Sequence, residues 1–368
     1  ASAMSAACTR SLPLAAALAR RGAGARLLGA RPGSAPLDWT NLGFEARPVA
    51  AYVRYNWKGG AWDDGALQPD GNVTIHALSN ALNYGQAVFE GLKALQCKDG
   101  SVALFNPRAN LARLTAGCAR LQMPAPPAEL FLKGLERAVA ANAAYVPPYG
   151  TGGALYLRPL LFGHGAQLGL GAAPEYCLMI APNPVGAYYS GGLHGVDAIV
   201  VEDYDRAAPR GVGAVKAAGN YAPDVLPSRR AKAAGYSVCL YLDARTNTHV
   251  EEFSTSNFIG VTKDGTVVTP ASPSILPSCT REVVLQAARD LGLKAEHRPV
   301  RWDEVRDLAE AAACGTAVVL TPMRSITRGS EVVRFHGFET VQRLFAHISA
   351  LQAGDAPDPH GYRHVVAL

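Results

Sequence analysis

Lys216 is the residue of this sequence whose surroundings most favour chemistry. It lies in GVGAVKAAGNYAP (211–223) among small apolar residues and three glycines, and no other lysine occurs between Lys133 and Lys232. Removal of an ammonium group from water lowers its pKa, and the neutral amine can attack an aldehyde to form a Schiff base. On this segment alone, a lysine at a strand end that points to water is the simpler interpretation. Other residues must therefore carry the argument for catalysis.

The elements that would position this lysine form a mixed pattern of strands and helices. Apolar runs bounded by turn residues predict strands over 51–57, 154–162, 175–182, 195–204, 237–244, 249–261 and 266–270. Apolar spacings of three and four residues predict helices after Pro107 and over 128–144, 222–236, 280–291, 303–313 and 340–351. No regular βαβ alternation appears. We therefore expect two α+β domains with a cleft between them.

The domain boundaries are predicted from a concentration of turn-forming residues. Pro, Gly and Ser concentrate in NPVGAYYSGG (183–192), between two strand-like runs. We expect an N-terminal domain over 38–184, a linker over 185–192 and a C-terminal domain over 193–368 that carries Lys216.

Charge and composition exclude several classes of protein. The 368 residues are 49% hydrophobic and 18% charged, and no uncharged apolar run approaches the roughly 18 residues of a membrane span. The formal net charge is +5, but residues 1–37 hold five arginines and no lysine, aspartate or glutamate. The rest of the chain therefore has no net charge, so we expect neither a nucleic-acid nor a membrane partner.

Cysteine and histidine spacing gives no sign of a metal site. The seven cysteines form no CxxC pair, and His249, His297, His360 and His364 have no cysteine or carboxylate cluster near them in sequence. We interpret these histidines as surface or loop residues, the cysteines as free thiols of a reducing compartment, and we expect no bound metal.

Seven stretches, taken in chain order, share the motifs of one enzyme family. They are LNYGQAVFEGLKA (82–94), NPRANLARL (106–114), LYLRP (155–159), KAAGNYAP (216–223), EEFSTSNFI (251–259), ILPSCTRE (275–282) and CGTAVVLTP (314–322). Together they resemble the branched-chain amino acid aminotransferases, which are fold-type IV pyridoxal 5'-phosphate enzymes. The residues of these motifs look closer to plant, algal or bacterial forms than to animal ones. EGLKA separates this group from D-amino acid aminotransferases and aminodeoxychorismate lyases. Those relatives, and a non-catalytic pyridoxal phosphate carrier, are the alternatives.

The resemblance implies a two-domain fold-type IV structure and a role for each cofactor-binding residue. Lys216 would form the internal aldimine with pyridoxal 5'-phosphate and also act as the catalytic base. Glu252 would face the protonated ring nitrogen, which makes the cofactor a better electron sink. Glu251, next to it in a strand, would point the other way, and we expect it to be exposed. Tyr221 would bind the phenolic oxygen.

The phosphate of the cofactor needs positive charge and backbone donors. The resemblance implies that Arg113 supplies a bidentate fork and Thr316 a hydroxyl. Cys279 and Thr280 would contribute free N–H groups at the start of a helix, where a phosphate is favoured. We expect Cys279 to act through its backbone and not as a reactive thiol.

The substrates implied by the resemblance are leucine, isoleucine and valine, with 2-oxoglutarate as the partner. Their hydrocarbon side chains would share one pocket lined by Phe89, Tyr156 and Tyr221, and bordered by Tyr84 and Arg158. As large aromatic residues these could equally be core. The α-carboxylate would be held by backbone N–H groups of the turn Gly315-Thr316-Ala317.

The sequence departs from the family pattern at two places. Mammalian mitochondrial members have a redox-sensitive CxxC after the carboxylate turn, whereas this chain has Val318 and Thr321 there, so we expect no thiol switch. The sequence PVAAY (48–52) also differs from the usual segment that covers the substrate pocket.

The resemblance further implies a homodimer, in which a loop of one subunit closes the pocket of the other. Residues 1–37, rich in Arg, Ala, Leu and Ser, have the composition of a transit peptide. Arginines interleaved with leucines favour import into the mitochondrial matrix, and the plastid stroma is the alternative. A retained N-terminal extension is the alternative to a transit peptide.

Overall fold

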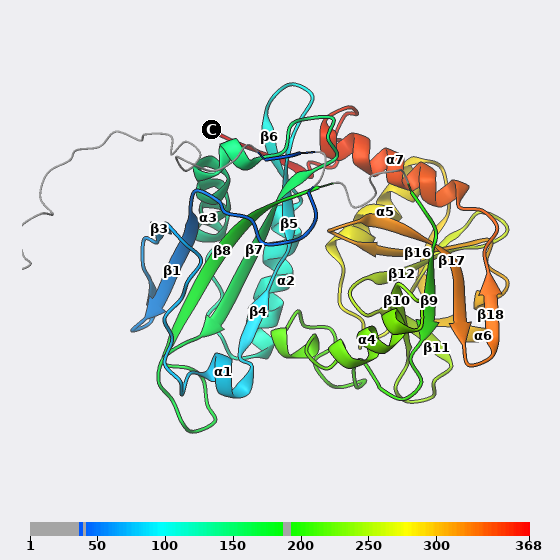
Figure 1. The fold of residues 1–368 in the computed structure, drawn as a ribbon, viewed down its shortest axis with the longest axis horizontal. Helices are drawn as coiled ribbons and strands as arrows, with labels where there is room; N and C mark the ends of the chain where they lie inside the picture. Colours follow the sequence, from blue (N-terminus) through cyan, green and yellow to red (C-terminus); the bar gives the residue numbers. More distant parts are fainter. Residues whose placement is uncertain (1–36, 40–41, 187–192) are drawn as a thin grey trace, which may run out of the picture.

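The computed structural model describes residues 37–39, 42–186 and 193–368. These residues form two large β-sheets, each with its own helices, that lie beside one another along the long axis of the molecule (Figure 1). The predicted α+β class is confirmed.

The first sheet has nine strands. In chain order they are β1 (Tyr52–Lys58), β2 (Ala61–Trp62), β3 (Ala66–Gln68), β4 (Ala87–Phe89), β5 (Leu92–Gln96), β6 (Val102–Phe105), β7 (Ala154–Gly163), β8 (Glu175–Val185) and β19 (Arg363–Val366). The spatial order is β19-β6-β5-β7-β8-β1-β2, with β3 on β1 and β4 on β7. Its long centre is the antiparallel pair β7 and β8, whose register runs from Ala154 opposite Val185 to Gly163 opposite Tyr176.

The second sheet has ten strands. They are β9 (Val196–Val200), β10 (Val238–Leu242), β11 (His249–Phe253), β12 (Asn257–Val261), β13 (Val267–Pro270), β14 (Ala295–Arg298), β15 (Val300–Arg301), β16 (Glu310–Gly315), β17 (Val319–Arg328) and β18 (Glu331–Arg334). The order is β14-β13-β12-β16-β17-β9-β10-β11-β15, with β18 on β17. Because β11 also pairs with β12, through Glu252 opposite Asn257, six strands close into a ring.

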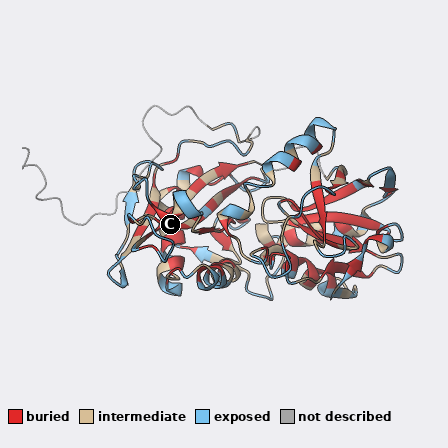
Figure 2. Ribbon diagram, turned by 90° about the horizontal axis from the view of Figure 1, so that it is seen from below, coloured by how far each residue is buried: buried red, intermediate tan, exposed pale blue. Residues whose placement is uncertain are grey.

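Helices cover both sheets. They are α1 (Asn80–Tyr84), α2 (Pro107–Arg120), α3 (Ala128–Ala141), α4 (Val225–Ala233), α5 (Cys279–Asp290), α6 (Trp302–Val305) and α7 (Glu339–Ala353), with 3-10 turns η1 (Ala143–Tyr145) and η2 (Ala218–Asn220). α3 packs on β8 and β1, and α2 packs on β4. α5 and α7 pack on each other and on β16. Buried residues accordingly concentrate inside each half of the molecule (Figure 2).

Helix α2 shows how sequence periodicity aims a functional side chain. Its apolar stripe buries Leu114 and Cys118 fully, with Leu111 and Leu121 packed beside them in the same core. Burial of such a stripe fixes the rotation of a helix about its axis. Arg113, which lies beside the stripe as the sequence predicts, consequently points into the space between the two sheets.

The predicted helix over 303–313 is wrong. Helix α6 ends at Val305, and β16 begins at Glu310 in the middle of the second sheet. Ala312 packs in the core beneath α5 and α7, whereas Ala311 and Ala313 pack in the core on the other face of the strand. The small alanines fit a strand covered on both faces, and this packing overrides their helix propensity.

The ends of the predicted domains need one correction. The last strand of the chain, β19, pairs with β6 in the first sheet and not with the second sheet, to which 193–368 was assigned as a whole. Without β19, the apolar strand β6 would be an edge of its sheet. The other boundaries stay predictions: nearly all of the transit peptide (1–37) and most of the linker (185–192) lie outside the described residues. Among the described helices, none combines the length and apolar character that crossing a membrane requires.

Asn142 ties the segment in front of β1 to the end of α3. Its Oδ1 accepts hydrogen bonds from the backbone N–H of Ala50 (2.8 Å) and Ala51 (3.2 Å). Its Nδ2 donates to the carbonyls of Ala51 (2.8 Å) and Ala138 (2.7 Å), and the side chain is fully buried. One side chain thus satisfies four backbone groups.

We expect Asn142→Ala to lower the free energy of unfolding by about 3 kcal/mol, because it leaves several buried polar groups without a partner. Chemical denaturation followed by tryptophan fluorescence measures this. Asn72→Ala, at an exposed position, is the control and should change stability by less than about 0.5 kcal/mol. Equal stability of the two variants would contradict the assigned role of Asn142.

Candidate active site

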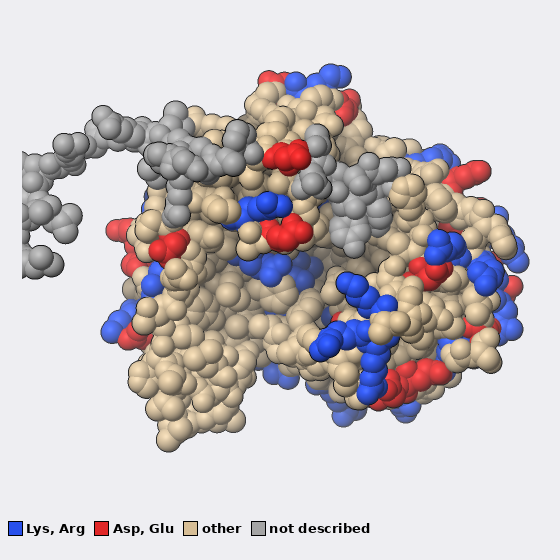
Figure 3. Space-filling model, viewed as in Figure 1, with Lys and Arg blue, Asp and Glu red and all other residues tan. Residues whose placement is uncertain are grey.

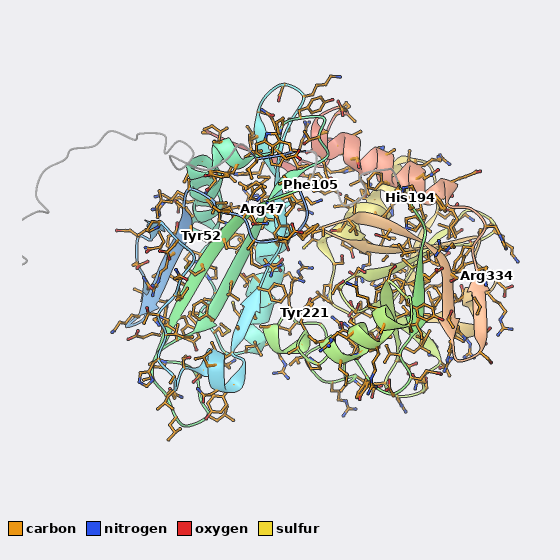
Figure 4. All side chains as sticks on the ribbon, in the orientation of Figure 1. Arg47, Tyr52, Phe105, His194, Tyr221 and Arg334 are labelled. Carbon is orange, nitrogen blue, oxygen red and sulfur yellow. The ribbon has the colours of Figure 1, made fainter. Side chains whose placement is uncertain are left out.

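A cavity of about 650 Å³ lies between the two sheets. In the space-filling view a hollow separates the two halves, and lysine or arginine atoms are visible inside it (Figure 3). The cavity collects predicted site residues from both halves of the chain: Phe89, Arg113, Tyr156, Arg158, Lys216, Tyr221, Thr316 and Ala317. Residues more than 200 positions apart therefore share one site, with Tyr221 between the sheets (Figure 4).

Lys216 is held between the two halves. Its carbonyl accepts a hydrogen bond from the backbone N–H of Phe89 in β4, at 3.1 Å, and its neighbour Ala217 forms a β-bridge with Val88. Its Nζ donates to the hydroxyl of Tyr221 at 2.9 Å. Burial, aided by the charge of Arg113, lowers the pKa of Lys216 to about 8. A neutral amine is therefore accessible near neutral pH, as a nucleophilic lysine requires.

Glu252 lies on β11, behind Asn257 and Leu276, two residues that line the cavity and hydrogen-bond to its carboxylate. Nη1 of Arg206 lies 2.6 Å from Oε1 of Glu252, and the backbone N–H of Leu276 donates to the same oxygen at 2.9 Å. Nδ2 of Asn257 donates to Oε2 at 3.2 Å. Burial raises the pKa of Glu252 to about 7, although Arg206 opposes the shift. The sequence gives no sign of Arg206, which lies in a loop ten residues before Lys216.

The expectation that Glu251 is exposed is wrong. Its residue exposure is 4%, and the hydroxyl of Ser272 donates to its carboxylate at 2.6 Å. β11 lies between β10 on one side and β12 and β15 on the other, and both faces of this strand are covered, so consecutive residues are both buried. Burial raises the pKa of Glu251 as well. The two carboxylates nevertheless have different partners, as strand alternation predicts.

Arg113 is already engaged on one edge. Its Nε and Nη2 donate to the two carboxylate oxygens of Glu90, at 2.7 and 2.6 Å, and its Nη1 donates to the carbonyl of Pro277 at 3.0 Å. Glu90 is fully buried and also accepts from Nδ2 of Asn110 at 2.8 Å. Glu90 occupies the Nε and Nη2 edge of the guanidinium, which leaves the Nη1 and Nη2 edge, where Nη1 also bonds to Pro277, for the predicted phosphate. The sequence motif contains Glu90 but does not by itself indicate this role.

The start of α5 has the properties of an anion site. Ser278 is the N-cap, and its hydroxyl accepts from the backbone N–H of Arg281 at 3.1 Å. Cys279 and Thr280 begin the helix as predicted, where unpaired N–H groups and the helix dipole favour an anion. The hydroxyls of Thr280 and Thr316 lie 3.4 Å apart. Burial raises the pKa of Cys279 to about 11, which keeps it a thiol.

Aromatic side chains and Arg158 line the opposite wall. The rings of Phe89 and Tyr221 meet edge to face with centroids 5.0 Å apart. Arg158 donates to the hydroxyl of Tyr156 at 3.2 Å, and its guanidinium carbon lies 4.9 Å from the centre of the Phe89 ring. Strand alternation on β7 places Tyr156 and Arg158 on the same face. Gly91 is required beside them, because a Cβ there would lie 1.9 Å from the Tyr156 hydroxyl.

Tyr84 does not border this cavity within the chain, which corrects the sequence prediction. It ends the short helix α1, is 45% exposed, and donates its hydroxyl to the carbonyl of Leu168 on an outer loop. Helix α1 packs on β7, and Tyr84 is not among the residues that line the cavity.

The turn between β16 and β17 forms the remaining wall. Gly315, Thr316 and Ala317 line the cavity, and so do Val318 and Thr321, the positions without cysteine. No group of three or more potential metal-ligating side chains occurs in the described part of the chain.

Comparison with known proteins identifies the same group. The family "Amino-transferase class IV" matches residues 87–326. The branched-chain-amino-acid aminotransferase of Haemophilus influenzae is 42% identical over 339 residues, which cover 89% of this chain and 98% of that protein. Branched-chain-amino-acid aminotransferase 5, chloroplastic, of Arabidopsis thaliana is 41% identical over 88% of this chain and 79% of that protein. The resemblance to bacterial and plant forms is confirmed.

The fold is shared with solved structures of the same group. The branched-chain amino acid aminotransferase of Thermobaculum terrenum, solved in its PLP-bound holo form, superimposes with a TM-score of 0.71 at 23% identity, over 87% of this chain and 99% of that one. The family match covers most of the described residues, and the identity to the bacterial relative extends over nearly the whole length of both proteins. The chain therefore belongs to the class IV aminotransferase family, within its branched-chain amino acid aminotransferases.

Proposed function

We propose that the protein transfers the amino group between leucine, isoleucine or valine and 2-oxoglutarate, with pyridoxal 5'-phosphate as cofactor. The observation that carries the proposal is Lys216: a desolvated amine, hydrogen-bonded to Tyr221, in a cavity lined by Asn257 and Leu276, which hold the buried carboxylate of Glu252, and by Ser278, the N-cap of α5. The activity printed for the bacterial and plant relatives supports it.

The residues of the site fit this cofactor. When bound, it supplies an electron sink for the bond to be broken at Cα and carries the amino group between the two substrates. Arg113, Thr316 and the backbone N–H groups of Cys279 and Thr280 would hold the phosphate. Tyr221 would bind the phenolic oxygen.

Glu252 would hold the ring nitrogen protonated. Its pKa is raised to about 7 by burial, and a positive ring nitrogen beside it would favour the ionised carboxylate. Arg206 and the N–H of Leu276 fix the position of this carboxylate before any ligand arrives. No solvent reorganisation is then needed during the reaction.

Lys216 would move the proton. As a neutral amine, Nζ of Lys216 would take the proton from Cα of the amino acid and carry it toward C4' of the cofactor. Tyr221, 2.9 Å away, holds Nζ on the correct side. A pKa of about 8 suits both directions of transfer near neutral pH.

The aromatic wall and the hairpin turn would select the substrate. Phe89, Tyr156 and Tyr221 offer apolar surface to a branched side chain, and the backbone N–H groups of Gly315-Thr316-Ala317 would bind the α-carboxylate. Glutamate must place its second carboxylate in the same pocket, where Arg158 and the tyrosine hydroxyls supply polar partners.

We expect Lys216→Ala to lower turnover by about 10³-fold or more, because nucleophile and proton carrier are lost together. The assay measures 2-oxoisocaproate from leucine and 2-oxoglutarate, with pyruvate from aminodeoxychorismate as the test for a lyase and D-leucine as that for a D-amino acid aminotransferase. The exposed Lys232→Ala is the control. Normal turnover of the Lys216 variant, or pyruvate as the main product of the wild type, would refute the proposal.

We expect Glu252→Gln to retain most of its cofactor affinity but to lose turnover by about 10²-fold, because an amide does not hold the ring nitrogen protonated. The matched variant Glu251→Gln, one residue away and bonded to Ser272, should stay within about threefold of wild type. Stopped-flow measurement of one half-reaction separates binding from proton transfer. A normal Glu252 variant with an inactive Glu251 variant would show that the two roles are exchanged.

We further propose a homodimer, supported by an uncharged face. Residues 73–86 and 163–174 contain no Asp, Glu, Lys or Arg, and the lobe that carries α1 is free of charge in Figure 3. Leu82, Leu168 and Leu170 are 61, 72 and 85% exposed there, beside Tyr84. Exposed apolar patches of this kind mark interfaces. A second copy seated on this face would cover Tyr84 and give it a place beside a pocket.

Leu82→Glu should convert the dimer to monomer in sedimentation velocity at micromolar concentration, because it places a charge in an apolar interface. Val332→Glu, on the exposed strand β18 of the other half, should leave the dimer intact. A fully active wild-type preparation that sediments only as monomer would refute the homodimer.

Residues 1–37 are proposed to direct import into an organelle. Arginines interleaved with leucines favour the mitochondrial matrix, whereas the chloroplastic relative of 41% identity favours the plastid stroma. Residues 1–40 fused to a fluorescent protein should send it to one of these compartments, and co-localisation with organelle markers identifies which. Diffuse cytosolic signal would refute import. Removal of residues 1–37 should leave activity in vitro unchanged.

A further inference from the structure

Lys93 connects the two halves of the molecule at a position that the proposed chemistry does not use. It lies on β5 of the first sheet, and its Nζ donates a hydrogen bond of 2.7 Å to the carbonyl of Ala317, in the turn between β16 and β17 of the second sheet. The two residues are 224 positions apart in the chain. The bond therefore fixes the turn from the opposite domain.

The location of this ammonium group is energetically unfavourable on its own. Desolvation lowers the pKa of Lys93 to about 8. Lys93 is partly buried, and an ammonium group that has lost part of its water needs a directed partner, since an unpaired charge there is costly. The carbonyl of Ala317 is that partner, and the bond joins a flexible side chain to one defined peptide group.

The turn itself has a strained backbone that requires support. Val319 has φ +63°, and the backbone N–H of Leu320 donates to the carbonyl of Val318 at 2.8 Å, which is a γ-turn of the rare positive-φ kind. A β-branched residue strongly disfavours this conformation, which persists only where the surroundings fix it. Pairing of Gly315 with Val319 holds the base of the hairpin, and Lys93 holds its tip.

We propose that Lys93 is a positioning residue for the α-carboxylate of the substrate: by fixing the Ala317 peptide group, it keeps the N–H groups of the Gly315-Thr316-Ala317 turn aimed into the cavity. This inference rests on the proposed role of that turn. It extends the substrate site to a side chain of the opposite sheet. It also explains why a lysine, and not an apolar residue, stands at this position of β5.

An alternative role for Lys93, in binding the cofactor phosphate, can be distinguished from this assignment by experiment. Lys93 also borders a small cavity with Cys279, Thr280 and Thr316, at the proposed phosphate site. A lysine that served the phosphate would change cofactor affinity when removed. A lysine that serves the carboxylate turn would change the affinity for carboxylate ligands and leave cofactor affinity unaltered.

The experiment compares the holoenzyme of wild type with Lys93→Met and Lys93→Arg. The probe is 4-methylvaleric acid, an unreactive carboxylate of leucine shape, with binding measured by calorimetry. We expect Lys93→Met to bind it roughly tenfold or more weakly and to raise KM for leucine by a similar factor, with a smaller change in kcat, because a displaced turn misaims its donors. Lys93→Arg retains a cationic donor and should recover most of the affinity.

Two controls make the outcome specific. The half-reaction of 3-methylbutylamine, which lacks the carboxylate, should proceed equally in wild type and Lys93→Met. Lys98→Met, on the exposed surface of the same domain, should bind 4-methylvaleric acid as wild type does. Unchanged binding in Lys93→Met, an equal loss for the amine, or reduced affinity for pyridoxal phosphate with normal carboxylate binding would overturn the inference.

Ala317→Pro distinguishes this failure from failure of the proposed site. This variant removes one backbone N–H of the turn. If it binds 4-methylvaleric acid normally, the turn is not the carboxylate site and both assignments fall. If it loses binding while Lys93→Met does not, only the role of Lys93 is refuted.

Discussion

The bridge from Glu90 through Arg113 to Pro277 is the interaction on which the site depends. Glu90 lies between β4 and β5 of the first sheet, Arg113 belongs to a helix packed on that sheet, and Pro277 precedes the first turn of α5 in the second half. The bridge fixes the distance between the sheet that supplies the aromatic wall and the helix start that attracts an anion. It also orients the arginine, because a bidentate carboxylate leaves a planar guanidinium little freedom. The segment 276–278 then reaches Glu252 through the N–H of Leu276, so that one loop links both ends of the site.

Desolvation acts on the two titrating residues of the site in opposite directions. It lowers the pKa of Lys216 to about 8 and raises that of Glu252 to about 7, since in each case it disfavours the charged form. Burial thus brings the pKa values of both groups close to neutral pH. Cys279, in the same surroundings, becomes less reactive, because the thiolate is the form that burial disfavours.

Much of the site could be predicted from sequence, and the exceptions share a physical cause. The rotation of α2 and the start of α5 follow from periodicity, whereas Lys216 is assigned from the resemblance of its motif to one enzyme family, because its local composition alone favours a lysine that points to water. Arg206, Glu90 and the burial of Glu251 follow from neither, because each depends on a partner supplied by another element: Glu252, Arg113 and Ser272. β16 was predicted as helix for the same reason, since only the cores above and below the strand decide between the two states for a run of alanines. Tyr84 is the opposite case: its motif predicts a place at the cavity, but within one chain only its motif neighbour Phe89 lines the cavity.

The return of β19 to the first sheet has a consequence for how the protein is made. A ribosome releases β6 early and β19 last, with the entire second half of the chain between them. During synthesis β6 therefore remains an unpaired edge of its sheet until β19 has been made. The strands of the second sheet all lie between β6 and β19 in sequence, so this sheet can form first. The first half is begun first but completed last, which makes the C-terminal residues the closing step of assembly and β6 the surface most in need of protection until then.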